Sequence, residues 1–273
     1  MLTDAHCHPA NLAPLFPAAE DERRRLGVGC VSSSTTLEEF EFCEGLAHDA
    51  KADSTAPVLP GFAVHPQMPL YGRCGEDALS ADLAVLDMLA DGGRLAVVGE
   101  TGFDLFNADF RETEKAQDRL FAAHLDAALR HGLPLVLHVR RAMHKVFAHA
   151  SALKKCRSVV FHSWSGTEGD GEALLRRGIN AFFSFGTVIA LNHRQAMRCC
   201  ATFPADRLLT ETDAPYQPLR GKGFSGHGDL PRILEAMAAL RREAGNSGMS
   251  AGELEGIVEG NFRTAFCTSI EIT

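Results

Sequence analysis

The chain has 273 residues, of which 45% are hydrophobic and 23% charged, and a net charge of -8 with histidine neutral. This composition is that of a globular protein, and the negative charge excludes a general basic field that would hold a polyanion by counterion release. No stretch reaches the roughly 20 apolar residues that a membrane-spanning helix needs. The eight cysteines are scattered and include no C-x-x-C pair, which favours reduced thiols. We therefore expect a cytoplasmic protein without membrane association or an obligate protein partner.

The first predicted strand, residues 1–5, runs directly into a histidine pair. His6 and His8 are two residues apart, a spacing that in an extended strand sends both imidazoles to the same face. Two imidazoles that converge on one point make half of a divalent metal site. Taken alone, such a pair is more often a chance occurrence on a solvated edge. Cys7 lies between the two histidines and points to the opposite face, so we expect it in the core.

Seven further apolar runs follow at fairly even intervals, and stretches of helical periodicity lie between them. They lie at residues 27–31, 58–64, 95–98, 133–138, 158–162, 181–186 and 207–213. Eight apolar strands separated by helices predict a parallel sheet buried on both faces, and we expect the α/β fold of a (β/α)8 TIM barrel. An open doubly wound sheet is the main alternative, but it would more often carry a glycine-rich turn after its first strand. Because no linker rich in Pro, Gly or Ser divides the chain, we expect a single domain over residues 1–273.

Ligand-type side chains stand at the carboxyl ends of five predicted strands, where barrel enzymes keep their active sites. These residues are His6, His8, Glu100, His138, His162 and Asp213. We expect the first two histidines, Glu100 and Asp213 to bind one divalent ion, and Glu100, His138 and His162 to bind a second. Glu100 is the natural bridge because its carboxylate has two oxygens. A water between two ions about 3.5–4 Å apart becomes a nucleophile near neutral pH, and Asp213 is placed to take its proton.

Each of these residues also has an ordinary structural explanation. His138 and His162, taken singly, are more often core histidines bonded to a backbone carbonyl. Glu100 in Gly-Glu-Thr-Gly could cap a turn, and Asp213 before Ala-Pro could form an Asx turn. Their joint occurrence at strand ends of one predicted barrel favours the metal centre.

With these residues in place, the chain resembles the TatD family of metal-dependent hydrolases and deoxyribonucleases, within the amidohydrolase-like barrels. The matching motifs run nearly end to end, at residues 4–8, 61–66, 99–104, 137–140, 161–166, 209–216, 220–222 and 261–262. The resemblance implies a (β/α)8 barrel with a divalent metal centre that cuts phosphodiesters, often as a 3′-to-5′ exonuclease on DNA, and it supports the ligand roles given above. Many related amidohydrolases bridge their metals with a carboxylated lysine, and no lysine stands at the strand end of Glu100 in this chain. The chain departs from the family pattern after Gly102, at Trp164 and at His227.

Five residues near the predicted centre are candidates for binding substrate. His65 could bond a phosphate oxygen or hold the activated water, and a capping role before Pro66 is as plausible. Arg140 faces the same way as His138 and could clamp a phosphate or form a salt bridge at the barrel mouth. Trp164 could stack on a base or pack beneath a loop. The basic pair after the last strand could follow a nucleic-acid backbone or be solvated surface; it consists of Arg220 and Lys222.

We therefore predict a deoxyribonuclease that acts on single strands or ends of DNA. Its cofactors would be two divalent ions, Zn, Mg or Mn, and its catalytic residues Asp213 and Glu100. One alternative keeps the same centre but cleaves a small-molecule amide, lactone or ester, which the acidic net charge mildly favours. A non-catalytic metal-binding scaffold is the alternative from another class.

Overall fold

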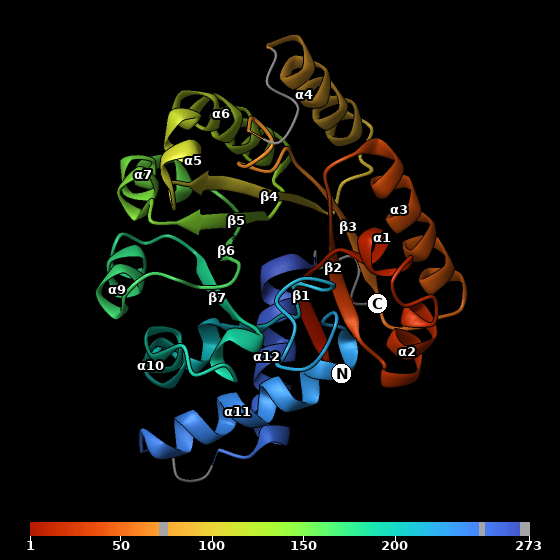
Figure 1. Cartoon of the computed structure of the whole chain (residues 1–273), viewed down its shortest axis with the longest axis vertical. Coiled ribbons are helices and arrows are strands. Elements are labelled where there is room, and N and C mark those ends of the chain that lie inside the picture. Colours follow the sequence, from red (N-terminus) through yellow and green to blue (C-terminus); the bar gives the residue numbers. More distant parts are fainter. Residues whose placement is uncertain (71–75, 246–248, 268–273) are drawn as a thin grey trace.

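Eight parallel strands form one sheet in chain order, and helices surround it (Figure 1). The structure is a computed structural model that describes residues 1–70, 76–245 and 249–267. The strands are β1 (Thr3–Cys7), β2 (Gly29–Ser34), β3 (Val58–Phe62), β4 (Val97–Asp104), β5 (Leu135–Arg140), β6 (Val159–Phe161), β7 (Ala181–Phe185) and β8 (Leu208–Thr210). Each predicted apolar run overlaps one of them, so the predicted (β/α)8 TIM barrel is confirmed.

The barrel closes between β1 and the chain that follows β8. The backbone N–H of Asp213 donates to the His6 carbonyl over 2.9 Å, and the N–H of His8 donates to the Ala214 carbonyl over 2.7 Å. The Thr210 hydroxyl also donates to the Thr3 carbonyl over 2.6 Å. These bonds hold the carboxyl ends of the first and last strands side by side, although they lie about 200 residues apart in sequence.

The helices lie outside the strands or across one end of the barrel. They are α1 (Pro9–Leu12), α2 (Ala19–Leu26), α3 (Leu37–Ala52), α4 (Glu76–Asp91), α5 (Ala108–Glu112), α6 (Glu114–His131), α7 (Met143–Ala148), α8 (Ala150–Leu153), α9 (Glu168–Arg176), α10 (Arg194–Thr202), α11 (Leu230–Glu243) and α12 (Ala251–Phe266), with the 3-10 turns η1 (Thr187–Ile189), η2 (Ala205–Arg207) and η3 (His227–Asp229). Thr36 and Ser250 begin α3 and α12 with capping boxes that satisfy the first free N–H groups. None of the helices in the described parts of the chain has both the length and the apolar character to cross a membrane.

The barrel interior is filled by one apolar side chain from each strand. Phe262 and Phe266 of α12 pack against this layer, so α12 covers one end of the barrel. The eight strand residues are Ala5, Val31, Leu59, Val97, Val136, Val160, Phe182 and Leu209. A larger apolar cluster fills the space between the strands and the outer helices. The polar strand ends therefore open at the opposite end of the barrel from α12.

Two strands contain a register shift that changes the direction of their side chains. In the pairing of β1 with β2, Asp4 lies opposite Cys30 and Cys7 lies opposite Ser32, with a bulge between the two pairs. Ala5 belongs to the interior layer and Cys7 to the outer cluster. A regular strand would put these two side chains on the same face, so the bulge is what turns Cys7 outward.

The second shift lies in β4, between Val98 and Thr101 in its pairing with β5. This strand continues to Asp104, whereas the sequence predicted an apolar run over residues 95–98 that ends in Gly-Glu-Thr-Gly. Gly102 makes the continuation possible, because a Cβ on this residue would lie 2.2 Å from the His138 carbonyl oxygen. The Gly-Glu-Thr-Gly motif is thus part of the strand and aims Glu100 at the barrel mouth.

Burial of His124 predicts a loss of stability in acid. The side chain is fully buried in α6; its Nε2 accepts from the Val64 N–H at 2.9 Å and its Nδ1 donates to the Leu120 carbonyl at 2.6 Å. Burial lowers its pKa from 6.5 to about 4. The unfolded chain therefore binds a proton that the folded chain excludes, and stability falls as the pH drops from 6.5 toward 4.

We expect this one group to contribute about 3 kcal/mol to that loss. The measurement is urea unfolding at several pH values for the native chain and for His124→Gln. The variant should show a shallower decrease between pH 6.5 and 4, and His48→Gln, on the exposed side of α3, controls for removal of an imidazole. Equal slopes in all three proteins would contradict the assignment.

Candidate metal centre

The six predicted ligands meet at the carboxyl end of the barrel, around the carboxylate of Glu100. Oε2 of Glu100 lies 3.2 Å from Nε2 of His6 and 3.9 Å from Nε2 of His8. The two histidine Nε2 atoms are 3.1 Å apart, so the imidazoles converge as the two-residue spacing predicts.

The other oxygen of Glu100 faces a different group of imidazoles. Oε1 lies 2.6 Å from Nδ1 of His138, 3.2 Å from Nε2 of His162 and 3.3 Å from Nε2 of His65. Glu100 is only 4% exposed. One buried carboxylate thus divides its two oxygens between two sets of nitrogen donors, which is the arrangement required of a bridging ligand.

Asp213 completes the group around the first histidine pair. Its Oδ1 lies 3.5 Å from the Nε2 atoms of both His6 and His8, and its Oδ2 accepts from Nε2 of Gln217 over 2.6 Å. The backbone of Asp213 has a φ of 54°, in the left-handed region that residues other than glycine rarely adopt. Its backbone bond to β1 holds this conformation in place.

The division of the ligands differs in detail from the prediction. Potential ligand atoms lie within 4.8 Å of one another in three groups: His6 with His8 and Glu100, His6 with His162 and Asp213, and His65 with Glu100 and His138. His162 therefore lies between the two predicted sites. His65, which we expected to bind substrate, lies beside Glu100 as a further candidate ligand.

Most of the imidazoles are oriented by a second polar group. Ser33 Oγ lies 3.1 Å from His6 Nδ1, and Asp104 Oδ2 lies 3.1 Å from His138 Nε2. Glu211 Oε2 lies 3.2 Å from His162 Nδ1, while its Oε1 accepts from the Ser163 N–H and hydroxyl. Sequence reasoning assigned none of these orienting roles. Glu211 could have been found, because it lies two residues before Asp213 in a stretch already identified.

The charges within the centre compensate one another. Burial by itself would raise the pKa of Glu100, but His162, His65 and His6 hold that pKa well below its ordinary value. Asp213 behaves in the same way. Burial would raise its pKa, but the hydrogen bond from His8 and the charges of the nearby histidines lower that pKa below its ordinary value. Both carboxylates are therefore ionised at neutral pH. Anionic oxygens and several convergent imidazoles are a donor set that fits divalent ions.

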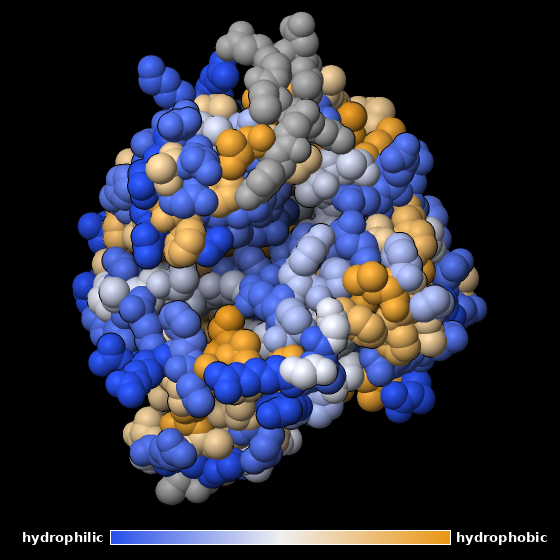
Figure 2. Space-filling model, viewed as in Figure 1, coloured by the Kyte–Doolittle hydropathy of each residue, from blue (hydrophilic) through white to orange (hydrophobic). Residues whose placement is uncertain are grey.

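An open cavity of about 670 Å3 lies over the centre. Figure 2 shows a hollow near the middle of this face, with a mainly hydrophilic floor. Glu100, Asp213 and all the site histidines except His6 line the cavity. Two of the predicted substrate-binding residues, His65 and Arg140, also line it.

The other three substrate candidates lie elsewhere. Trp164, which we predicted to stack on a base, is 3% exposed, packs edge-on against Phe161, Phe183 and Phe203, and does not border the cavity. Its ring packs beneath the loop, which is the alternative that the sequence left open. Arg220 is exposed and Lys222 pairs with Asp229, and neither borders the cavity.

Comparison with known proteins identifies relatives over almost the whole chain. A family model described as TatD related DNase matches residues 3–267. The 3'-5' ssDNA/RNA exonuclease TatD of Enterobacter lignolyticus is 33% identical over 244 residues, which cover 87% of each chain. The uncharacterized metal-dependent hydrolase YjjV of Escherichia coli is 29% identical over 88% of this chain and 90% of its own. The crystal structure of that TatD homologue superposes with a TM-score of 0.81 at 26% identity, covering 98% of both chains.

Removal of the Glu211 charge should weaken metal binding without removing a ligand. Glu211 is fully buried and faces Nδ1 of His162, so it favours the tautomer that presents Nε2 to the centre. We expect Glu211→Gln to lower the affinity for divalent ions by about 10- to 100-fold, measured by isothermal titration calorimetry. Glu172→Gln, in an exposed ion pair on α9, is the matched control. Unchanged affinity in Glu211→Gln would show that His162 does not bind metal through this arrangement.

Proposed function

The chain belongs to the TatD family of metal-dependent hydrolases, and from that premise we propose that it hydrolyses phosphodiester bonds at the ends of single-stranded nucleic acid with two divalent ions. The observation that carries the proposal is the division of the two Glu100 oxygens between two groups of imidazoles beneath an open cavity. Several relatives bear the name 3'-5' ssDNA/RNA exonuclease. We further propose that residues 1–273 act as a single domain.

The residues that would hold the ions follow from the distances around Glu100. His6, His8, Glu100 and Asp213 would hold one ion. Glu100, His138 and His162 would hold the other, with His65 as a further nitrogen donor beside it. Mixed ligation by imidazole and carboxylate suits Zn or Mn. Mg would bind mainly through the carboxylate oxygens, because it prefers oxygen ligands. When bound, two such ions lower the pKa of water and neutralise charge on a phosphate.

Asp213 is the group placed to move the proton. Gln217 binds its Oδ2, which leaves Oδ1 directed toward the histidine pair and the cavity. As a water oxygen forms its bond to phosphorus, Asp213 accepts the proton that the water loses. The bond from phosphorus to the leaving oxygen breaks with its electron pair, and the leaving oxygen takes up a proton in turn. Asp213 can return its proton there, so no proton is gained or lost.

Arg140 is the cation best placed to bind a substrate phosphate. Its guanidinium lies 4.2 Å from the centre of the Phe106 ring, and the guanidinium of Arg141 lies 4.5 Å from the same centre. Nη1 of Arg140 is 3.4 Å from Asp104 Oδ2, which fixes its position at the cavity. This local pair of cations provides an anion site on a chain whose overall charge is negative. A local contact with the end of a nucleic-acid strand fits the negative net charge of the chain better than a long interface with a duplex does.

The first test is a nuclease assay on single-stranded DNA with Mg2+ or Mn2+ added to the purified chain. We expect Asp213→Asn to lower kcat by roughly 10^2- to 10^4-fold, the usual contribution of a positioned general base, and a chelator to abolish digestion. Asp206→Asn, exposed on η2, should retain full activity. Digestion that survives both the chelator and Asp213→Asn would overturn the proposal. Metal-dependent turnover of lactones or amides without digestion of DNA would favour the small-molecule alternative.

The second test concerns Arg140. Because its guanidinium would bind phosphate and take no part in bond breaking, Arg140→Ala should raise KM for single-stranded DNA and leave kcat nearly unchanged. The slope of log kcat/KM against log salt concentration should become shallower by about 0.7, the value for one phosphate contact on a single strand. Arg232→Ala, on the exposed side of α11, is the matched control. A salt slope identical to that of the native chain would exclude the contact.

A further inference from the structure

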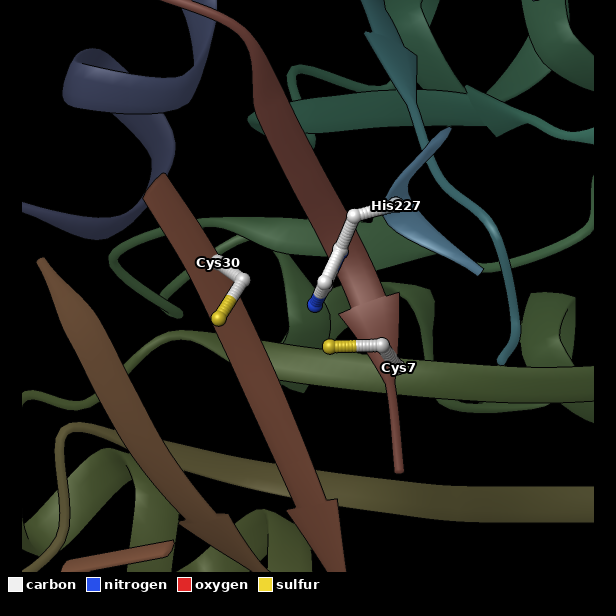
Figure 3. A group of neighbouring side chains, drawn as sticks. All are labelled: Cys7, Cys30 and His227. Atoms are coloured by element: carbon white, nitrogen blue, oxygen red, sulfur yellow. The ribbon is translucent and has the colours of Figure 1, made fainter. Parts of the chain in front are cut away.

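A second group of metal-ligand side chains lies on the outer side of the barrel wall. Sγ of Cys7 on β1, Sγ of Cys30 on β2 and a ring nitrogen of His227 in η3 lie within 4.8 Å of one another. The three side chains are 1%, 0% and 3% exposed. Figure 3 shows them directed toward one another, with a nitrogen of the His227 ring facing the two cysteines. None of the three borders the cavity over the metal centre.

The barrel itself brings the two cysteines together. They stand on neighbouring strands, and both belong to the apolar cluster between the strands and the outer helices. The bulge in β1 is required for this, because it turns Cys7 outward although Ala5 faces the interior. On the other side, the N–H of Gly228 donates to Glu22 Oε2 over 3.1 Å and fastens η3 to α2, which places His227 over the cysteine pair.

A buried carboxylate fixes the direction of the His227 ring. Asp4 Oδ2 lies 3.0 Å from Nδ1 of His227, which leaves Nε2 as the ring atom for a further ligand. The same Asp4 accepts from the hydroxyl and the N–H of Thr212 at 2.6 and 2.9 Å, so its position is fixed from two sides. A carboxylate that holds one nitrogen of an imidazole while the other is presented to an ion is the usual outer arrangement of a metal-binding histidine.

We propose that Cys7, Cys30 and His227 form a second, thiolate-rich metal site that binds a thiophilic divalent ion of the Zn2+ class. Tetrahedral ligands at the usual Zn–S and Zn–N lengths of about 2.3 and 2.0 Å are separated by about 3.5–3.8 Å, so the ligand atoms need to move by about 1 Å or less. Binding converts the two thiols to thiolates and releases two protons to solvent. A separate cavity of about 310 Å3 borders Cys30 and His227. It has room for water as the fourth ligand, since one water occupies about 30 Å3.

The ligand chemistry separates this site from the catalytic centre. The catalytic centre offers only nitrogen and oxygen donors, whereas the outer group offers two sulfurs, and soft thiolate ligands select Zn2+ over Mg2+. In this structure the Cys7 thiol donates to the Val31 carbonyl over 3.4 Å, and binding of an ion would replace this bond. An ion at this position joins β1, β2 and η3, and its role would be structural.

The test uses Co2+ as a spectroscopic probe for Zn2+ on the full chain, stripped with a chelator and kept reduced. Sulfur ligation produces a thiolate-to-cobalt charge-transfer band in the near ultraviolet, to which a nitrogen and oxygen centre does not contribute. We expect the native chain to show the band, with an intensity at saturation that corresponds to one thiolate-bound Co2+ per chain, and Cys30→Ser to lose it. Cys156→Ser removes a buried cysteine outside the group and should keep the band. Cys7 is left unchanged because both its neighbours are proposed catalytic ligands.

A second measurement needs no variant, in case Cys30→Ser fails to fold. X-ray absorption of the native chain loaded with Zn2+ should show sulfur neighbours at about 2.3 Å in addition to nitrogen and oxygen. The absence of both the band and the sulfur neighbours in the native chain would overturn the proposal. A band of equal intensity in folded Cys30→Ser would overturn it as well.

Discussion

The carboxylate of Glu100 is the group on which the architecture of the site depends. A buried carboxylate is strongly destabilising unless other groups compensate its charge. Here five imidazole nitrogens surround its two oxygens, and they come from β1, from β5 and from the chain directly after β1, β3 and β6. Those histidines are close enough to repel one another when they are protonated. The buried carboxylate and the imidazoles therefore stabilise each other, or are stabilised by cations that lie between them. The barrel supplies the set because all parallel strands end at the same rim.

Two irregularities in the strands direct the ligands to that rim. The bulge in β1 lets both Ala5 and His6 face the interior, the first in the apolar layer and the second at the candidate metal centre. The shift in β4 directs Glu100 to the same place, and Gly102 keeps that strand against the His138 carbonyl at a distance that no side chain would allow. Regular strands would close the same barrel but would not aim these groups at one point.

The sequence predicted all eight strands and the convergence of the six ligands because both follow from periodicity and from the common direction of parallel strands. It did not place His65 beside Glu100, and it left open whether Trp164 stacks on a base or packs beneath a loop, since each residue type suits both environments and only tertiary packing decides between them. The extension of β4 was missed because Gly-Glu-Thr-Gly has the composition of a turn. The approach of His227 to Cys7 depends on how the irregular chain after β8 folds back over β1, and no local pattern specifies that path.

The folded-back segment connects the two groups of ligands. Asp4 bonds to Thr212 on one side and to His227 on the other, and Thr212 precedes Asp213, whose backbone bonds to His6. The position of η3 and the position of the Asp213 carboxylate are therefore set by the same short stretch of β1. Asp213 itself holds a left-handed φ, a conformation that persists only where the surrounding structure holds it in place. A constraint that ties β1, β2 and η3 together from outside the barrel would act on the proposed catalytic centre through this stretch and Asp213, without any contact with the cavity over that centre.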